Sequence, residues 1–126
     1  MPLLETALVA SDVVKTEDAS YRSRDTAIIN SGSGKLKVGT VLAKVTATGK
    51  FVPAAASGAD GSQTAVAVLL FPVDATSADA KAVILTRHAQ VSHAGLIYGA
   101  TINDATKRAA ANAQLNAVGI IVRQGA

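Results

Sequence analysis

A short glycine and serine segment, SGSGK at residues 31–35, is the first place where this chain could bind an anion. Phosphate-binding loops need glycine so that backbone N–H groups can approach the anion closely. The nucleotide-binding pattern also requires Gly at position 29, which is Ile here, and Ser or Thr at position 36, which is Leu. The residues that follow have the pattern of a strand rather than of a helix. We therefore expect a polar loop between strands and no nucleotide cofactor.

Two histidines are the next candidates for chemistry. His88 and His93 lie in a region with the pattern of a strand and a loop, so their side chains should tend to opposite faces. The chain has no Cys, and no acidic residue stands between the histidines to complete a metal site. No G-x-S-x-G nucleophile motif is present. We expect surface or interface histidines, no metal and no catalytic residues. An enzyme whose polar groups are assembled by long-range folding stays an alternative.

The charge distribution restricts the partners. Twelve Lys and Arg against nine Asp and Glu give a net charge of +3, but the basic residues are spread along the chain. Aromatic residues are only 3% of the chain, so there are few aromatic side chains on which nucleic-acid bases could stack. We therefore expect no direct nucleic-acid binding. A weak positive charge is also suited to binding an acidic surface of another protein. No stretch approaches the roughly 20 apolar residues of a membrane helix, and no basic n-region of a signal peptide is present.

Periodic patterns indicate a mainly β domain. Residues 41–48 alternate with a period of two, and Gly49 offers a turn before residues 51–53, which predicts a hairpin over residues 40–53. Residues 63–71 are apolar on both faces, as in a strand that is covered on both sides, and Pro72 ends them. Further strands are expected at residues 82–87, 95–98 and 119–123. The total is about five or six short strands.

One helix is predicted near the C-terminus, over residues 104–116. Asn103 or Asp104 can cap its start, and Gly119 stands where a helix typically stops. Alanines repeat every four residues along it, which predicts a thin contact stripe of small side chains against a sheet: Ala105, Ala109, Ala113 and Ala117.

The length of 126 residues suits one domain with its own core. Because large side chains are scarce, we expect part of the stability to come from association with other subunits. Residues 1–20 differ from residues 21–126: they carry four acidic residues against Lys15 alone and show no clean period of two. They are either a frayed terminus or an arm that becomes ordered on a partner.

Several segments taken together resemble the head decoration proteins of tailed bacteriophages, of the kind typified by phage lambda. They are YRSRD at residues 21–25, GTVLAKVT at 39–46, TGKFVP at 48–53, ADGSQT at 59–64, LIY at 96–98 and GIIVR at 119–123. The resemblance implies a small barrel or sandwich-like β domain with one C-terminal α-helix and a flexible N-terminal arm. It also implies a homotrimer on the outside of the expanded capsid, at local three-fold positions, that stabilises the head against the pressure of packaged DNA.

The same resemblance implies a partner and a binding segment. The partner is the major capsid protein, and the arm would become ordered on the shell by adding a strand to a sheet of that protein. The location would be the virion, after assembly in the host cytoplasm, with no cofactor. The expected capsid-binding residues are Leu3, Leu4, Leu8, Val9, Val13, Val14, Tyr21 and Arg24. A non-viral β-rich binding or adhesion module is the other alternative, and it would need an export signal or an anchor.

Overall fold

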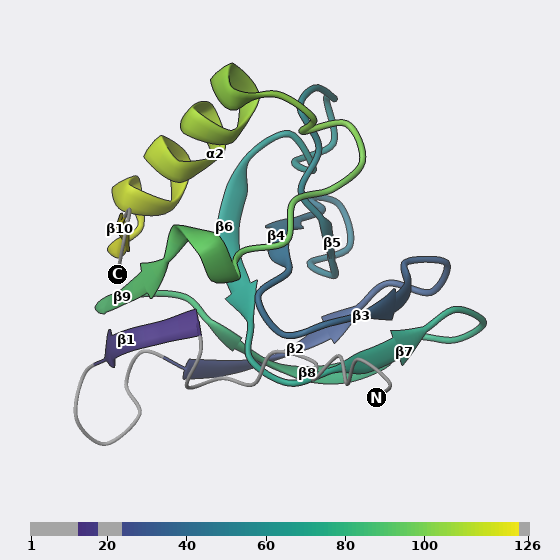
Figure 1. Ribbon diagram of the computed structural model, residues 1–126. Coiled ribbons are helices and arrows are strands. Elements are labelled where there is room, and N and C mark those ends of the chain that lie inside the picture. The colour runs from purple at the N-terminus through teal and green to yellow at the C-terminus, as the bar shows by residue number, and fades with distance from the viewer. Residues whose placement is uncertain (1–12, 18–23, 124–126) are drawn as a thin grey trace, which may run out of the picture.

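The computed structural model describes residues 13–17 and 24–123. Strands dominate these residues, and a single α-helix comes near the C-terminus (Figure 1). The elements in order are β1 (Val14–Glu17), β2 (Arg24–Ile29), β3 (Gly34–Leu36), β4 (Val41–Lys44), β5 (Phe51–Pro53), β6 (Ala65–Leu69), β7 (Val73–Ala75), β8 (Ala80–Leu85), β9 (Ala89–Ser92), the 3-10 helix η2 (His93–Gly95), α2 (Ala105–Ala117) and β10 (Ile120–Arg123).

Five strands close into a small barrel in the order β2-β5-β4-β6-β8. The longest pairing in it is antiparallel and joins β2 to β8, from Arg24 opposite Leu85 to Ile29 opposite Ala80. The predicted hairpin is confirmed, because β4 and β5 pair antiparallel and Gly49 between them has φ +71°. The mainly β fold with a barrel-like sheet is therefore confirmed.

Strand β6 is covered on both sides, as its apolar pattern predicted. Ala67 and Leu69 belong to a cluster inside the barrel together with Ile29, Leu42 and Ile84. Val68 and Leu70 belong to a second, larger cluster beneath α2. One strand thus contributes to both clusters, since alternate side chains point to opposite faces.

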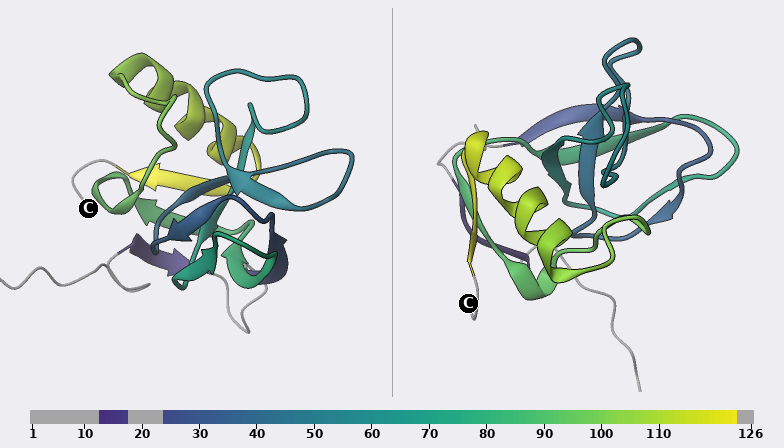
Figure 2. Two further views of the ribbon diagram at one scale, coloured as in Figure 1. Left: turned by 90° about the vertical axis from the view of Figure 1, so that its right-hand side faces the viewer. Right: turned by 90° about the horizontal axis from the view of Figure 1, so that it is seen from above.

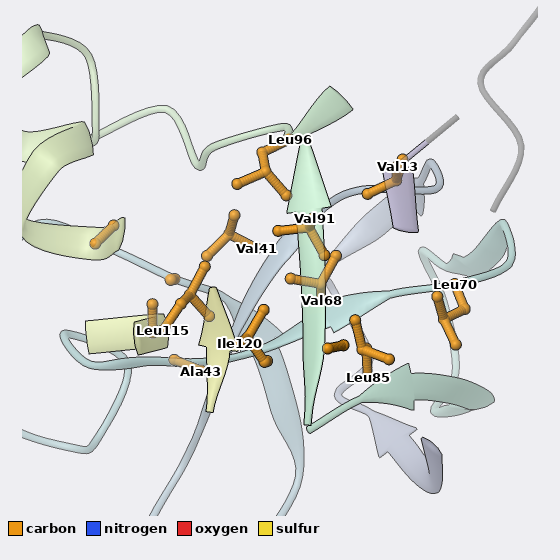
Figure 3. Packing of buried hydrophobic residues seen from close by; sticks show 14 of the residues in the cluster. Val13, Val41, Ala43, Val68, Leu70, Leu85, Val91, Leu96, Leu115 and Ile120 are labelled. Atoms are coloured by element: carbon orange, nitrogen blue, oxygen red, sulfur yellow. The ribbon is translucent and has the colours of Figure 1, made fainter. Parts of the chain in front are cut away.

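A second sheet has the order β1-β9-β10 and lies under α2 (Figures 1 and 2). In Figure 3, Leu115 of α2 and Ile120 of β10 lie beside Val41 and Ala43 of the barrel. All four side chains are fully buried. The larger cluster therefore joins the helix, the second sheet and the barrel into one core.

The helix itself was predicted well, but its contact face was predicted wrongly. Asp104 caps α2 by accepting a hydrogen bond from the Lys107 N–H at 2.8 Å, and Gly119 after the helix has φ +91°. The four alanines of the expected stripe are exposed, whereas Ala111 and Leu115 are buried. The larger Leu115 removes more apolar surface from water than an alanine can, so its face turns inward.

Two further expectations differ from the structure. Residues 95–98 form no strand: η2 ends at Gly95, and a single bridge joins Ile97 to Thr40. The described residues contain ten strands rather than five or six. Strands β3 and β7, which the sequence did not predict, have three residues each, too few for a period of two to be recognised. No helix in the described ranges is long and apolar enough to cross a membrane.

Replacement of His88 by Gly should stabilise the protein. His88, in the turn between β8 and β9, has φ +53° and an exposed side chain. This backbone conformation costs roughly 1–2 kcal/mol for a residue with a Cβ, and a glycine loses about 0.5–1 kcal/mol more backbone entropy on folding. We expect a net gain of about 0.5–1 kcal/mol in the free energy of unfolding, measured by chemical denaturation at fixed protein concentration. His88→Ala keeps the strain, so a gain of the same size in that variant would contradict the explanation.

Candidate functional site

Three of the eight expected capsid-binding residues lie in the described ranges: Val13, Val14 and Arg24. The other five, which are Leu3, Leu4, Leu8, Val9 and Tyr21, lie outside them. The described three do not form one exposed patch. Val13 is fully buried, and Val14 and Arg24 are partly buried.

Val13 is part of the core rather than of a separate arm. Its side chain belongs to the larger cluster, and Val14 packs against the same cluster while it pairs with Val91 of β9. Val13 lies beside Gly39, with its Cγ2 3.3 Å from the place that a Cβ on Gly39 would take. The structure therefore assigns residues 13–17 to the body, although the sequence had placed them in the arm.

A β-bulge explains why the sequence did not show this strand. Strand β1 pairs antiparallel with β9, but the register shifts between Val14 and Thr16. An extra residue in a strand interrupts the period of two by which strands are recognised. Strand β1 is at one edge of the sheet, because β9 is its only neighbouring strand within the described ranges.

Arg24 begins β2 at the rim of the barrel, opposite Leu85 of β8. The next residue, Asp25, accepts a hydrogen bond from Arg87 Nη2 at 2.7 Å and another from Thr86 Oγ1 at 3.1 Å. The Arg87 hydrogen bond and charge, helped by Thr86, hold the pKa of Asp25 below its usual range. These contacts stabilise the end of the β2–β8 pairing at which Arg24 lies.

A polar network connects η2 to α2. Tyr98 Oη donates to Asn112 Oδ1 at 2.6 Å, and His93 Nδ1 lies 3.0 Å from Tyr98 Oη and 3.2 Å from Asn112 Nδ2. Burial raises the pKa of Tyr98, against a smaller opposing effect of its hydrogen bond to Asn112. No group of three or more His, Cys, Asp and Glu residues that could hold a metal ion occurs in the described part of the chain. The hydrogen bonds of this network join η2 and Tyr98 to α2.

Residues 31–33 of the glycine and serine segment form a turn between β2 and β3, so the interpretation as a polar loop is confirmed for them, while Gly34 and Lys35 already belong to β3. The Ser31 N–H donates to the Asp79 carboxylate at 2.8 Å, and the Gly32 N–H donates to the Ala75 carbonyl. Both N–H groups are thus satisfied by the protein itself. Strand β3 follows, where a nucleotide-binding loop would require a helix.

A groove that the sequence did not reveal lies beside β3. We call it the lysine groove, and it is lined by residues 35–37, Thr40, Pro53 and residues 97–100, with a volume of about 360 Å³. Lys35 and Lys37 are exposed on its rim, and Leu36, Pro53 and Ile97 give it a partly buried apolar lining. Its residues come from three separate segments, so no local sequence signal could have revealed it.

A known family model matches most of the chain. Residues 3–120 match the family model described as bacteriophage lambda head decoration protein D. The chain belongs to this family. No curated protein sequence matches it significantly.

Membership in the head decoration family gives the protein a structural role in the phage virion. A head decoration protein binds the phage capsid, and its location is the capsid of the virion. The family is one of structural phage proteins rather than of enzymes. The functional surface of this decoration protein is therefore a protein-binding surface.

Proposed function

We propose that this decoration protein is a homotrimer that binds the outside of the expanded phage shell at local three-fold positions. There it contacts the major capsid protein and stabilises the head against the pressure of packaged DNA, after assembly in the host cytoplasm. The family match over residues 3–120 is the observation that carries the proposal. The protein has no catalytic role in this function.

Two features of the surface support self-association. Phe71 and Ile121 are large apolar residues with 46% and 44% of their surface exposed. Ile121 lies on β10, at an edge of the second sheet in the described part of the chain. A closed cyclic trimer can cover such residues without leaving an open end at which a fibre could grow. Because the core is built mostly of small side chains, we expect contacts between subunits to contribute part of the stability.

The N-terminal segment is the proposed anchor on the shell. Residues 1–12 contain Leu3, Leu4, Leu8 and Val9 and no Lys or Arg. An extended apolar segment can add a strand to an exposed sheet edge, where backbone hydrogen bonds give affinity and alternate side chains are buried. Tyr21 and Arg24 are proposed as additional contacts next to this anchor.

The experiment mixes purified protein with expanded and with unexpanded phage shells and measures binding by co-sedimentation. We expect decoration of expanded shells only, and light scattering should give three times the chain mass of 12.7 kDa for the free protein. Equal binding to both kinds of shell, or to neither, would overturn the proposed role. A monomer mass at high protein concentration would overturn the trimer alone.

A further inference from the structure

The outer edge of β10 carries a backbone donor that a side chain occupies. Strand β10 pairs parallel with β9, and the Ala89 N–H of β9 donates to the Gly119 carbonyl just before β10 at 3.1 Å. In a strand, the backbone polar groups of successive residues point to opposite sides. Because Gly119 faces β9, the N–H of Val122 points away from β9. It donates to Asn116 Oδ1 at 3.2 Å.

Without this contact, the edge would be open to another strand. Strand β9 is the only strand beside β10 within the described ranges, and Ile121 has 44% of its surface exposed. An exposed edge strand with unpaired N–H and C=O groups is a template for pairing with another chain. Helix α2, which carries Asn116, lies alongside β10 (Figure 2). The Asn116 side chain thus provides an oxygen where an added strand would place a carbonyl.

The opposite edge of the same sheet is protected in a different way. Strand β1 pairs antiparallel with β9, and its register shifts between Val14 and Thr16. A bulge leaves one residue unpaired and bends the strand, so this edge is a poor template for a further strand. The pairing of β10 with β9 has no such shift over its four residues. Of the two edges, the regular one is therefore the edge that Asn116 covers.

We propose that Asn116 keeps the outer edge of β10 closed to strand addition by a second copy of this chain. When the Asn116 oxygen is removed, two β10 strands pair antiparallel about a two-fold axis, since an isologous contact uses the same edge of both copies. The bulge on β1 ends the joined sheet, so association stops at a doubling of mass. Contacts of the proposed trimer through the Ile121 side chain are compatible with a closed edge, because that side chain stands on a face of the sheet.

The test compares Asn116→Ala with the unchanged protein by light scattering over a concentration series that reaches the millimolar range. We expect the variant to self-associate at least about tenfold more tightly, toward twice the mass of the unchanged protein, because the Val122 N–H of each copy gains a partner. At low concentration, the Val122 amide should exchange its hydrogen with solvent faster than in the unchanged protein, because its acceptor is gone.

Two variants control for other effects of the substitution. Asn116→Asp keeps an oxygen acceptor at the same place and should keep the mass of the unchanged protein. Asp104→Ala removes the hydrogen bond to the Lys107 N–H at the other end of α2, so it weakens the helix without touching β10. It should also keep that mass.

An unchanged mass of Asn116→Ala at every concentration would overturn the proposal. Association of Asn116→Asp to the same extent would overturn it too, because the oxygen acceptor would then be irrelevant. The same holds for Asp104→Ala, because loss of helix stability would then be the cause. Each result is a difference from the unchanged protein, so none of these failures affects the proposed capsid role or the proposed trimer.

Discussion

Gly39→Ala should lower the free energy of unfolding by about 1.5–4 kcal/mol. Gly39 has φ +93°, and a Cβ there would collide with the carbonyl oxygen of Gly95. The residue cannot shift freely, because its N–H donates to Leu69 at 2.9 Å and its carbonyl accepts from Ile97 at 2.8 Å. Backbone strain, net of the backbone entropy that alanine saves, contributes about 0.5–1 kcal/mol, and overpacking contributes about 1–3 kcal/mol.

Gly32→Ala is the matched control for this substitution. Gly32 has nearly the same conformation, φ +88°, but an added Cβ meets no atom within 4 Å. It should therefore cost only the strain net of the backbone entropy that alanine saves, about 0.5–1 kcal/mol. Chemical denaturation of both variants at one protein concentration separates the two contributions. Equal losses in the two variants would show that the contact of Gly39 with Gly95 is unimportant.

The elements that sequence reasoning predicted correctly are those with strong local signals. The hairpin of β4 and β5 combines alternating residues with Gly49 at positive φ. Helix α2 combines the Asp104 cap with Gly119 as its stop. In both cases the residues that specify the element lie within it or next to it, so no long-range contact is needed to recognise it.

The contact face of α2 could not be read from alanine spacing. The buried side of the helix includes polar side chains that serve the sheet: Gln114 Oε1 accepts a hydrogen bond from the Ala65 N–H at 2.8 Å, and Gln114 Nε2 donates to the Gln63 carbonyl at 3.3 Å. Asn112, at the other flank of the buried face, accepts from Tyr98. These partners are more than ten residues away in the sequence, so a pattern search counts Gln114 and Asn112 as solvent-facing residues.

The closure of the barrel and the candidate site depend even more on distant residues. Arg24 pairs with Leu85, and the lysine groove joins residues 35–37 to Pro53 and to residues 97–100. The boundary of the N-terminal segment was also hidden, because the register shift beside Val14 breaks the strand pattern of β1. Periodic patterns supplied the mainly β class and the helix, and family resemblance supplied the role, while the arrangement of these surfaces required the structure.

Deletion of residues 2–12 should reduce the affinity for expanded shells by roughly 10²–10⁴-fold while the body stays folded. The deletion removes Leu3, Leu4, Leu8 and Val9 and keeps Val13, which fills the core beside Gly39. In the proposed trimer, three segments bind together, because once one is bound the others have a high effective concentration. Loss of all three therefore removes this avidity as well as the contacts. Shell binding is measured by co-sedimentation across a concentration series, with light scattering and thermal unfolding of the free protein alongside.

A longer deletion, of residues 2–20, would confuse the result because it also removes β1. The edge of β9 would lose its partner, and the larger cluster would lose Val13, so reduced binding could come from a damaged body. The better control is Val13→Ala, which should cost about 2 kcal/mol of stability, because two buried methyl groups are lost, and leave shell affinity unchanged. A second variant of full length, with Ser at positions 3, 4, 8 and 9, keeps the backbone but removes the apolar side chains. If strand addition with burial of these side chains anchors the protein, this variant should bind nearly as weakly as the deletion. Unchanged affinity after deletion of residues 2–12 would mean that the body alone binds the shell.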